Sequence, residues 1–288
     1  MANETTSTTL NDLMPQIVAE ALFVASEKSI MRQLVRNYSI PAGSGKSIVV
    51  PRYPRVTAAA LNEAVAPSNT SVSTDGVTLT VSEVGLTTVV SDVALIGASS
   101  NVVADIGRLF GEAIARKMDS DLMGLFNTFT TNTVGSESTT ATVALLAQAA
   151  AKLRAQGYDT AADCAYILHP FVAYDIKANL TNTFANPNAG FVQNEAMAAG
   201  YIGTLFGIPV YESSLVGLEQ VVGGNDGDYA NALIHRDALG LAMMKDITIE
   251  SQREAQLRGF SLTGSAVYAV GELYDNAGVR MVFDSTIA

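Results

Sequence analysis

The spacing of apolar residues changes several times along the chain, and each spacing predicts a different element. Between Leu10 and Tyr38 apolar residues recur at helical spacing, interrupted by polar residues 26–29, which predicts one or two amphipathic helices. Residues 1–9 are rich in serine and threonine and are expected to be disordered. From Ser47 to Leu95 apolar and polar residues alternate, which is typical of strands.

The strand region is predicted to form a long two-stranded excursion. Its three prolines belong at an edge or in an extended arm, namely Pro51, Pro54 and Pro67. After a turn at Asp75–Gly76 the alternation holds until Val81 and changes parity before Val84, so a bulge or bend is expected beside Gly85. Residues 56–82 contain no lysine or arginine and few large apolar residues at the tip. An isolated hairpin is marginally stable, so a neighbouring subunit should support this one.

The strongest helical pattern spans Asn101–Phe129, a length of some 40 Å at about 1.5 Å per residue. One broad face is apolar and comprises Val102, Val103, Ile106, Leu109, Phe110, Ala113, Ile114, Met118, Leu122, Leu125 and Phe129. The opposite face is charged and comprises Asp105, Arg108, Glu112, Arg116, Lys117, Asp119 and Asp121. Such a helix should bury its apolar face against the rest of the domain.

The remainder of the chain predicts mixed helices and strands. Residues 131–140 predict a loop, and residues 141–156 predict a helix that ends at Gly157. A buried strand is expected through Leu168, followed by a helix that His169–Pro170 opens. Further strands are expected at 208–212, 232–244, 247–254, 260–274 and 278–285.

The stretch IPAGSGKSIVVPRYP, residues 40–54, contains the Gly45-Lys46-Ser47 that closes a phosphate-binding P-loop. A P-loop also needs a glycine five positions before Gly45, and a helix after the serine that faces the phosphates. Ile40 occupies the earlier position, and a β-branched run ending in Pro51 follows Ser47. We therefore predict a turn that leads into a strand, and no nucleotide site.

Composition narrows the class of protein. The 288 residues, 48% of them apolar, suffice for one large domain or two smaller ones. A net charge of −11 argues against a surface that grips nucleic-acid phosphates. A single cysteine permits no internal disulfide. The sequence opens without signal-peptide features and has no apolar run of about 18 residues, so a soluble protein made inside the cell is expected.

The residues that could carry chemistry form no recognisable set. His169 and His235 adjoin apolar strands, where hydrogen-bonded strand-end histidines are more common than metal ligands. Cys164 precedes an apolar run and is predicted to be a small core residue. Asp226 and Asp228 could offer oxygens to Ca²⁺, but the loop lacks the other spaced acids of an EF-hand, so a solvated turn is favoured.

Other candidates also favour a structural protein over an enzyme. Arg32 and Arg36 are four residues apart, and a solvated stripe on a helix is favoured over a binding site. The sequence contains neither a nucleophile elbow nor a zinc-binding HExxH helix. We predict no catalytic residue, no cofactor and no metal site.

The order of the predicted parts resembles the HK97-type major capsid proteins of tailed bacteriophages. YSIPAGSGKSIVVPRYP (38–54) is similar to the start of the family's extended E-loop, and VALIGASSNVVADIGRLFGEAIARKMDSDLMGLF (93–126) resembles its spine helix. YILHPFVAYDIKA (166–178) and GTLFGIPVYES (203–213) resemble parts of its axial domain. GSAVYAVGELYDNAGVRMVF (264–283) resembles its closing strands, so the resemblance covers nearly the whole chain.

The resemblance implies an α+β, HK97-like capsid fold. The expected parts are an N-arm (1–45), an extended E-loop hairpin (46–82), a P domain with the spine helix (83–135 and 241–275) and an α/β axial or A domain (136–240 and 276–288). It implies a major capsid protein whose hexamers and pentamers form an icosahedral phage head around double-stranded DNA. An encapsulin-type cellular compartment is the alternative, and a soluble enzyme is a remote one because no catalytic set can be assembled.

The resemblance also implies partners and a location. The protein would reside in the virion after assembly in the host cytoplasm, enclosing DNA without sequence-specific binding and without a membrane. A separate scaffolding protein and a portal are the expected partners beside the chain itself, and the presence of a decoration protein is left open. The family prototype cross-links an E-loop lysine to an asparagine of a neighbouring subunit. Lys46 and Asn276 match neither residue of that motif, so non-covalent contacts are expected to hold the shell together.

Overall fold

A computed structural model describes residues 29–41, 43–53, 74–93, 102–160, 163–184, 203–217 and 228–287, together with Val56, Ala58 and Ala60. The predictions for the disordered start, for most of the N-terminal helical arm, for the tip of the excursion and for Asp226 lie outside these residues. Within them helices and strands are mixed along the chain, so the predicted α+β class is confirmed.

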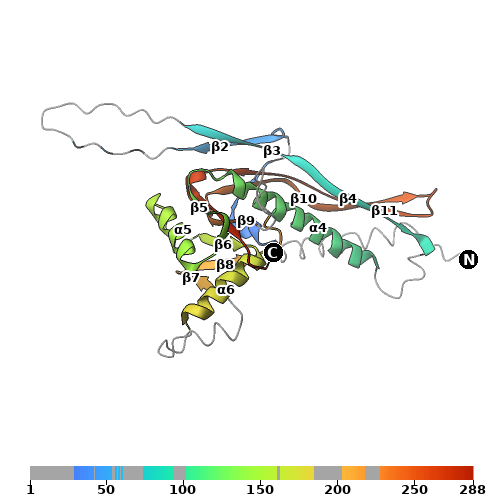
Figure 1. Cartoon of the computed structure of the whole chain (residues 1–288). Coiled ribbons are helices and arrows are strands. Elements are labelled where there is room, and N and C mark those ends of the chain that lie inside the picture. The colour runs from blue at the N-terminus through green and yellow to red at the C-terminus, as the bar shows by residue number, and fades with distance from the viewer. Residues whose placement is uncertain are drawn as a thin grey trace, which may run out of the picture.

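The first large sheet has four strands in the order β1-β10-β11-β4. Their bounds are Arg36–Ser39 for β1, Ser82–Ser91 for β4, Leu239–Glu254 for β10 and Gly259–Glu272 for β11. β10 and β11 form a long hairpin, β4 runs antiparallel along β11, and β1 lies parallel to β10. Helix α4 (Val102–Gly124) lies along this sheet (Figure 1) and continues as a 3-10 turn, η1 (Leu125–Thr128). The predicted long helix is thus confirmed.

Helix α4 buries a narrower stripe than its composition predicts. The buried side chains of the helix are Phe110, Ile114, Ala115, Met118, Asp119, Leu122 and Met123. Gly264 of β11 permits the close approach, since a Cβ there would lie 2.8 Å from the Phe110 ring. Three predicted placements are wrong: Leu109 is 63% exposed and Ala113 is also exposed, whereas Asp119 is 3% exposed. A helix that packs on one sheet buries only the positions facing it, and Leu109 lies outside that stripe.

The projecting hairpin is a separate two-stranded sheet. β2 (Ser47–Arg52) and β3 (Asp75–Thr80) pair antiparallel, with Ser47 opposite Thr80 and Arg52 opposite Asp75. Val81 separates β3 from β4: its N–H still donates to the carbonyl of Lys46 at 2.9 Å, and β4 joins the four-stranded sheet from the next residue. The bulge or bend predicted beside Gly85 is wrong, because Gly85 pairs in regular register opposite Ser265.

The second large sheet has six strands in the order β5-β12-β9-β6-β8-β7. Their bounds are Thr133–Thr140 for β5, Cys164–Leu168 for β6, Thr204–Leu205 for β7, Ile208–Glu212 for β8, Asp228–His235 for β9 and Gly278–Asp284 for β12. The helices α5 (Val143–Ala155) and α6 (Pro170–Phe184) flank it (Figure 1). The strands predicted through Leu168, at 208–212 and at 278–285 are confirmed, and so are both helices, although the second was predicted to be short and has 15 residues. The strand predicted at 247–254 is part of β10. A turn at residues 236–238 divides the single strand predicted at 232–244.

The loop predicted at residues 131–140 is wrong, because β5 pairs in parallel with β12. The segment resembles a loop because it contains Gly135, Ser136 and Ser138, which are residues typical of turns. β12 supplies the pairing that the local sequence does not favour. The strand is irregular as well, with Gly135 at φ 79° and Ser138 at φ 59°.

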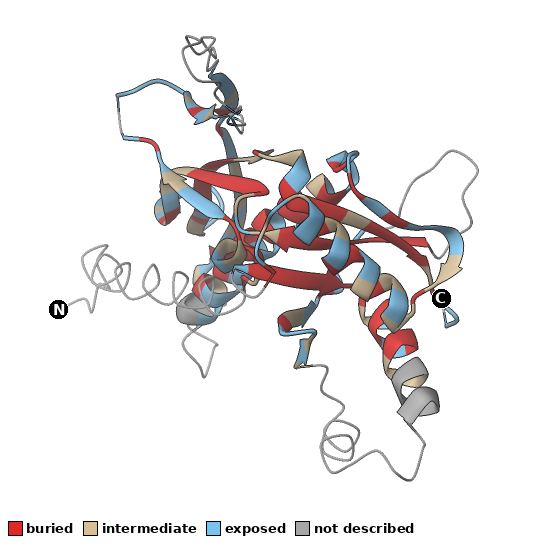
Figure 2. Ribbon diagram, turned by 90° about the vertical axis from the view of Figure 1, so that its left-hand side faces the viewer, coloured by how far each residue is buried: buried red, intermediate tan, exposed pale blue. Residues whose placement is uncertain are grey.

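A shared core and one carboxylate join the two large sheets. Buried residues line the central strands and the inner sides of the helices (Figure 2). At the junction of the two sheets, the ring of Phe129 packs so closely on Gly278 that a Cβ atom at Gly278 would lie 2.5 Å from the ring. Asp275, in the 3-10 turn η2 (Asp275–Ala277), accepts hydrogen bonds from the backbone N–H and the hydroxyl of both Thr130 and Thr131. Burial raises the pKa of Asp275, but these bonds outweigh it, so its pKa lies below the usual range.

Candidate functional site

Most residues of the β2–β3 hairpin are at least partly exposed to solvent. It projects from the body of the molecule in Figure 1, and Val49 and Tyr53 are exposed on it. A two-stranded sheet leaves unpaired N–H and C=O groups along both edges. The hairpin therefore offers apolar side chains and free backbone groups together, a combination suited to contact with another protein chain.

The root of the hairpin is held firmly to the body. A small second core there comprises Ile40, Val50, Leu79, Val81, Ala242, Ala269 and Leu273. Arg52 pairs with Asp75 across the hairpin and also donates from Nη1 to the carbonyl of Leu273 at 3.1 Å. The hydrogen bond from Arg52 holds the pKa of Asp75 below its usual range. Packing and hydrogen bonds together fix the direction in which the hairpin leaves the body.

Lys46 lies exposed at this root and has no helix behind it. Gly43 and Gly45 adopt φ values of 89° and 93°, and the Ser44 N–H donates to the carbonyl of Pro41 at 3.2 Å. The strand β2 begins immediately after Lys46. The segment is therefore the predicted turn before a strand, and the helix N-terminus that a P-loop requires is replaced by β2.

A groove of about 850 Å³ lies beside the hairpin root. Its walls are Arg36, Tyr38, Val50, Pro51, Arg52, Tyr53, Asp75, Thr131, Gln156, Tyr158, Asp237, Tyr274, Asp275 and Asn276. Its two arginines are already paired, Arg52 with Asp75 and Arg36 with Asp237. Four tyrosines and two ion-paired arginines give this groove a composition that is common where one protein segment contacts another.

The first residues that the structure describes contact a buried carboxylate in the middle of α4. Asp119 accepts hydrogen bonds from the Ser29 hydroxyl at 2.7 Å and from the Ile30 N–H at 2.9 Å. Burial outweighs these bonds and raises the pKa of Asp119. The side chains of Met31 and Val35 are fully buried in the chain's own core. Residues 29–35 are thus held against the body of the same chain.

The predicted helix over Leu10–Tyr38 is wrong at its described end. Among the residues that the structure describes before strand β1, the short helix α2 (Met31–Leu34) is the only helix. Arg32 therefore lies in α2 and pairs with Asp246 at 3.4 Å, whereas Arg36 begins β1 and pairs with Asp237. The two arginines form separate ion pairs and not one solvated stripe, because β10 draws the chain into parallel pairing from Arg36 onward.

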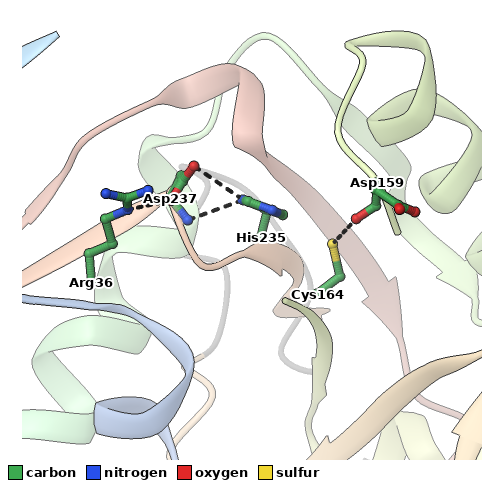
Figure 3. Close-up of polar contacts among 5 residues, drawn as sticks. All are labelled: Arg36, Asp159, Cys164, His235 and Asp237. Carbon is green, nitrogen blue, oxygen red and sulfur yellow. Dashed lines mark hydrogen bonds and ion pairs between the residues drawn. The ribbon is translucent and has the colours of Figure 1, made fainter. Parts of the chain in front are cut away.

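The two histidines are hydrogen-bonded at strand ends, as predicted. His169 follows β6, where its Nδ1 accepts from the Phe171 N–H at 3.3 Å and its ring stacks on Tyr229 at 3.8 Å. Burial lowers the pKa of His169. His235 ends β9 and accepts from the Asp237 N–H at 3.2 Å, as Figure 3 shows. Both rings serve the local fold.

Cys164 and Asp228 are both buried. The Cys164 thiol donates to the carbonyl of Asp159 at 3.4 Å (Figure 3), and burial raises its pKa to about 12, so it is a neutral core thiol at physiological pH. Asp228 begins β9 and is 1% exposed, so its predicted place in a solvated turn is wrong. Among the described residues, no three of His, Cys, Asp and Glu converge as a metal-ligand set.

Sequence reasoning missed the residues that position these surfaces, namely Arg52, Asp119 and Asp275. Only Asp119 carried a usable signal, because it falls within the i, i+3, i+4, i+7 series of Ala115, Met118 and Leu122. A carboxylate in such a stripe indicates a buried partner. No described helix is long and apolar enough to span a membrane.

The sequence profile of a family described as phage capsid protein matches residues 73–281 of the chain. No curated protein shows significant sequence similarity to it. Among solved structures, the chain is similar to the capsid of the cyanophage P-SCSP1u, with a TM-score of 0.69, 14% identity and coverage of 90% of this chain and 89% of that one. The chain is also similar to a solved structure of Mycobacterium phage Che8, with a TM-score of 0.66, 16% identity and coverage of 88% of this chain and 90% of that one.

A cellular shell also has a similar structure. The holo-SrpI encapsulin complex of Synechococcus elongatus matches with a TM-score of 0.63 and 15% identity, over 89% of this chain and 88% of that one. Coverage of nearly the full length on both sides means that the described elements, taken together, adopt the HK97-like fold that the sequence predicted.

Proposed function

The chain belongs to the phage capsid protein family and is a major capsid protein of the virion, and on that premise we propose that its hexamers and pentamers build an icosahedral head around double-stranded DNA. The observation that carries this proposal is the β2–β3 hairpin, which projects with exposed apolar residues from a rigid root. A surface of that kind is stable only when a neighbour covers it.

The division into parts follows from the same features. We propose an N-arm at 1–45, an E-loop at 46–82, a P domain at 83–135 and 241–275, and an A domain at 136–240 and 276–288. The turn at Gly43–Gly45 and the strand break at Val81 support the E-loop boundaries. The four-stranded sheet with α4 supports the P domain, and the six-stranded sheet supports the A domain.

The proposed partners of the chain follow from its proposed role as a shell around DNA. A net charge of −11 lets the inner wall hold packed DNA without sequence-specific adhesion to its phosphates. Assembly in the host cytoplasm would use a separate scaffolding protein and a portal, with a decoration protein on the outer surface. A structural role without enzymatic activity agrees with neutralised arginines in the groove and a neutral thiol at Cys164.

Electron microscopy of the purified chain tests the shell directly, and closed particles or ring-shaped capsomers are the expected result. A chain that stays monomeric at every concentration tested would contradict the proposal. Particles isolated with nuclease-protected double-stranded DNA favour the phage head, whereas a protein cargo without DNA favours the encapsulin-type compartment.

Boiling assembled shells in detergent should release a single band near 30.2 kDa, because the contacts between subunits are non-covalent. Higher species under reducing conditions would instead indicate a covalent link, with Lys46 as the first candidate.

Hydrogen exchange should report the hairpin's dependence on neighbours. In unassembled subunits the amides of β2 and β3 are expected to exchange faster than those of the four-stranded sheet, because each of the two strands has a hydrogen-bonded neighbour on one side only. Protection should rise at least tenfold in assembled shells. The amides of β11, paired on both sides, provide the internal control and should stay protected in both states. Equal exchange of β2 and β3 in subunits and shells would show that no neighbour covers the hairpin.

A further inference from the structure

A buried carboxylate oxygen at the start of β9 has no partner in the described chain. Asp228 accepts a hydrogen bond from the Ser138 N–H on Oδ1 at 3.0 Å. Its other oxygen, Oδ2, is buried without a hydrogen bond to any described residue. An ionised carboxylate in that state loses its hydration without compensation, which is costly. Something other than the described side chains is needed to satisfy Oδ2.

A second carboxylate lies directly opposite. In the antiparallel register of β9 and β12, Asp284 pairs with Asp228. Side chains of directly opposed residues project from the same face of a sheet, with their Cβ atoms about 5 Å apart. Within the described part of the chain, the Asp284 side chain forms no hydrogen bond or ion pair either. Two facing carboxylates repel each other unless a proton or a cation lies between them.

The neighbouring strand brings further oxygen atoms to this place. β5 pairs with β12 as far as Gly135 opposite Val282, and pairing resumes only at Thr140 opposite Asp284. The intervening residues 136–139 arch out of the ladder and reach Asp228 through the Ser138 N–H. The arch thus brings its backbone beside Asp228 and its last residue, Thr140, opposite Asp284, so peptide carbonyls and a hydroxyl are available as further oxygen ligands. Ca²⁺ prefers such ligands, since it takes six to eight oxygens in irregular geometry, water included.

We propose that Asp228 and Asp284 bind one Ca²⁺ ion, with peptide carbonyls of residues 136–140 and water as the remaining ligands. The ion would satisfy Asp228 Oδ2 and remove the repulsion between the carboxylates. It would also tie β5, β12 and β9 together where the regular pairing of β5 with β12 is interrupted. The site consists only of described residues and is independent of how the subunits assemble.

Calorimetric titration of the EDTA-treated protein with CaCl₂ should show one ion bound per chain. At constant ionic strength, the unfolding temperature should rise by about 3–5 °C when free Ca²⁺ is tenfold above its dissociation constant. Asp284→Asn should abolish both signals. Glu112→Gln removes the same charge from an exposed position of α4 and should leave both unchanged, which separates site binding from a general charge effect.

The wild-type titration decides the matter even if Asp284→Asn fails to fold. Absence of Ca²⁺ binding by the wild type would overturn the proposal. So would an equal rise in unfolding temperature in wild type and Asp284→Asn. If Asp284→Asn unfolds at a higher temperature than the wild type in EDTA and neither responds to Ca²⁺, the two carboxylates share a proton and there is no cation site.

Discussion

Leu122→Ala is expected to destabilise the folded subunit by about 2–5 kcal/mol, whereas Leu109→Ala should change its stability by less than about 0.5 kcal/mol. Both residues are leucines in α4. Leu122 is fully buried between the helix and the sheets, so its truncation removes apolar burial and leaves a cavity. Leu109 lies mostly in solvent, so its truncation exposes little that is not already exposed. Urea unfolding of unassembled subunits, followed by circular dichroism, measures both.

The pair also separates folding from assembly. Because Leu109 is exposed in the subunit, a loss of shells in Leu109→Ala without a loss of subunit stability would place Leu109 in an intersubunit contact. A stability loss in Leu109→Ala as large as that in Leu122→Ala would contradict the packing of α4 described above. An unchanged urea midpoint in Leu122→Ala would do the same.

Leu109 and Leu122 show which feature of α4 could not be predicted from the sequence. The period of apolar residues predicted the position and length of α4 well, because a long amphipathic pattern has few alternatives. The pattern could not tell which part of a broad apolar face meets the sheet. That choice depends on the shape of the partner surface, where Gly264 leaves room for Phe110 and nothing covers Leu109.

Strands were predictable where their own residues favour them. β6 and β8 were predicted from local composition, since a buried strand of apolar residues needs no knowledge of its neighbours. β5 was missed because its stability comes from β12, which lies far along the chain. The order of the six strands in the second sheet is likewise set by long-range pairing, so it could not be predicted from the local sequence.

The candidate site was predictable only in outline. The sequence indicated a projecting hairpin, because prolines and a lack of large apolar residues mark a segment that cannot fold alone. It did not indicate the root, where Arg52 bonds to Asp75 and to the carbonyl of Leu273. It placed Asp228 in solvent because turn-like residues surround it, whereas pairing with β12 buries it.

Removal of residues 2–28 is expected to leave subunits that fold normally but lose at least nine-tenths of their closed shells. The fold should persist because the anchor remains: Ser29 and Ile30 still bond to Asp119, and Met31 and Val35 still fill the core. The removed segment carries Leu13, Ile17 and Leu22 on a predicted amphipathic helix, and a neighbour must cover such a face. Unfolding temperature and electron microscopy measure the two properties separately.

Three further variants make the truncation informative. Cutting to residue 36 also removes Met31 and Val35, so it should lower the unfolding temperature as well as assembly, and this loss of core would otherwise be mistaken for a loss of contacts. In the full chain, serine at Leu13, Ile17 and Leu22 should reproduce the assembly defect of the shorter truncation, whereas serine at Asn11, Asp12 and Gln16 should not. Closed shells in normal yield from residues 29–288 would show that the hairpin and the domain surfaces suffice, because the arm would then be dispensable for joining subunits.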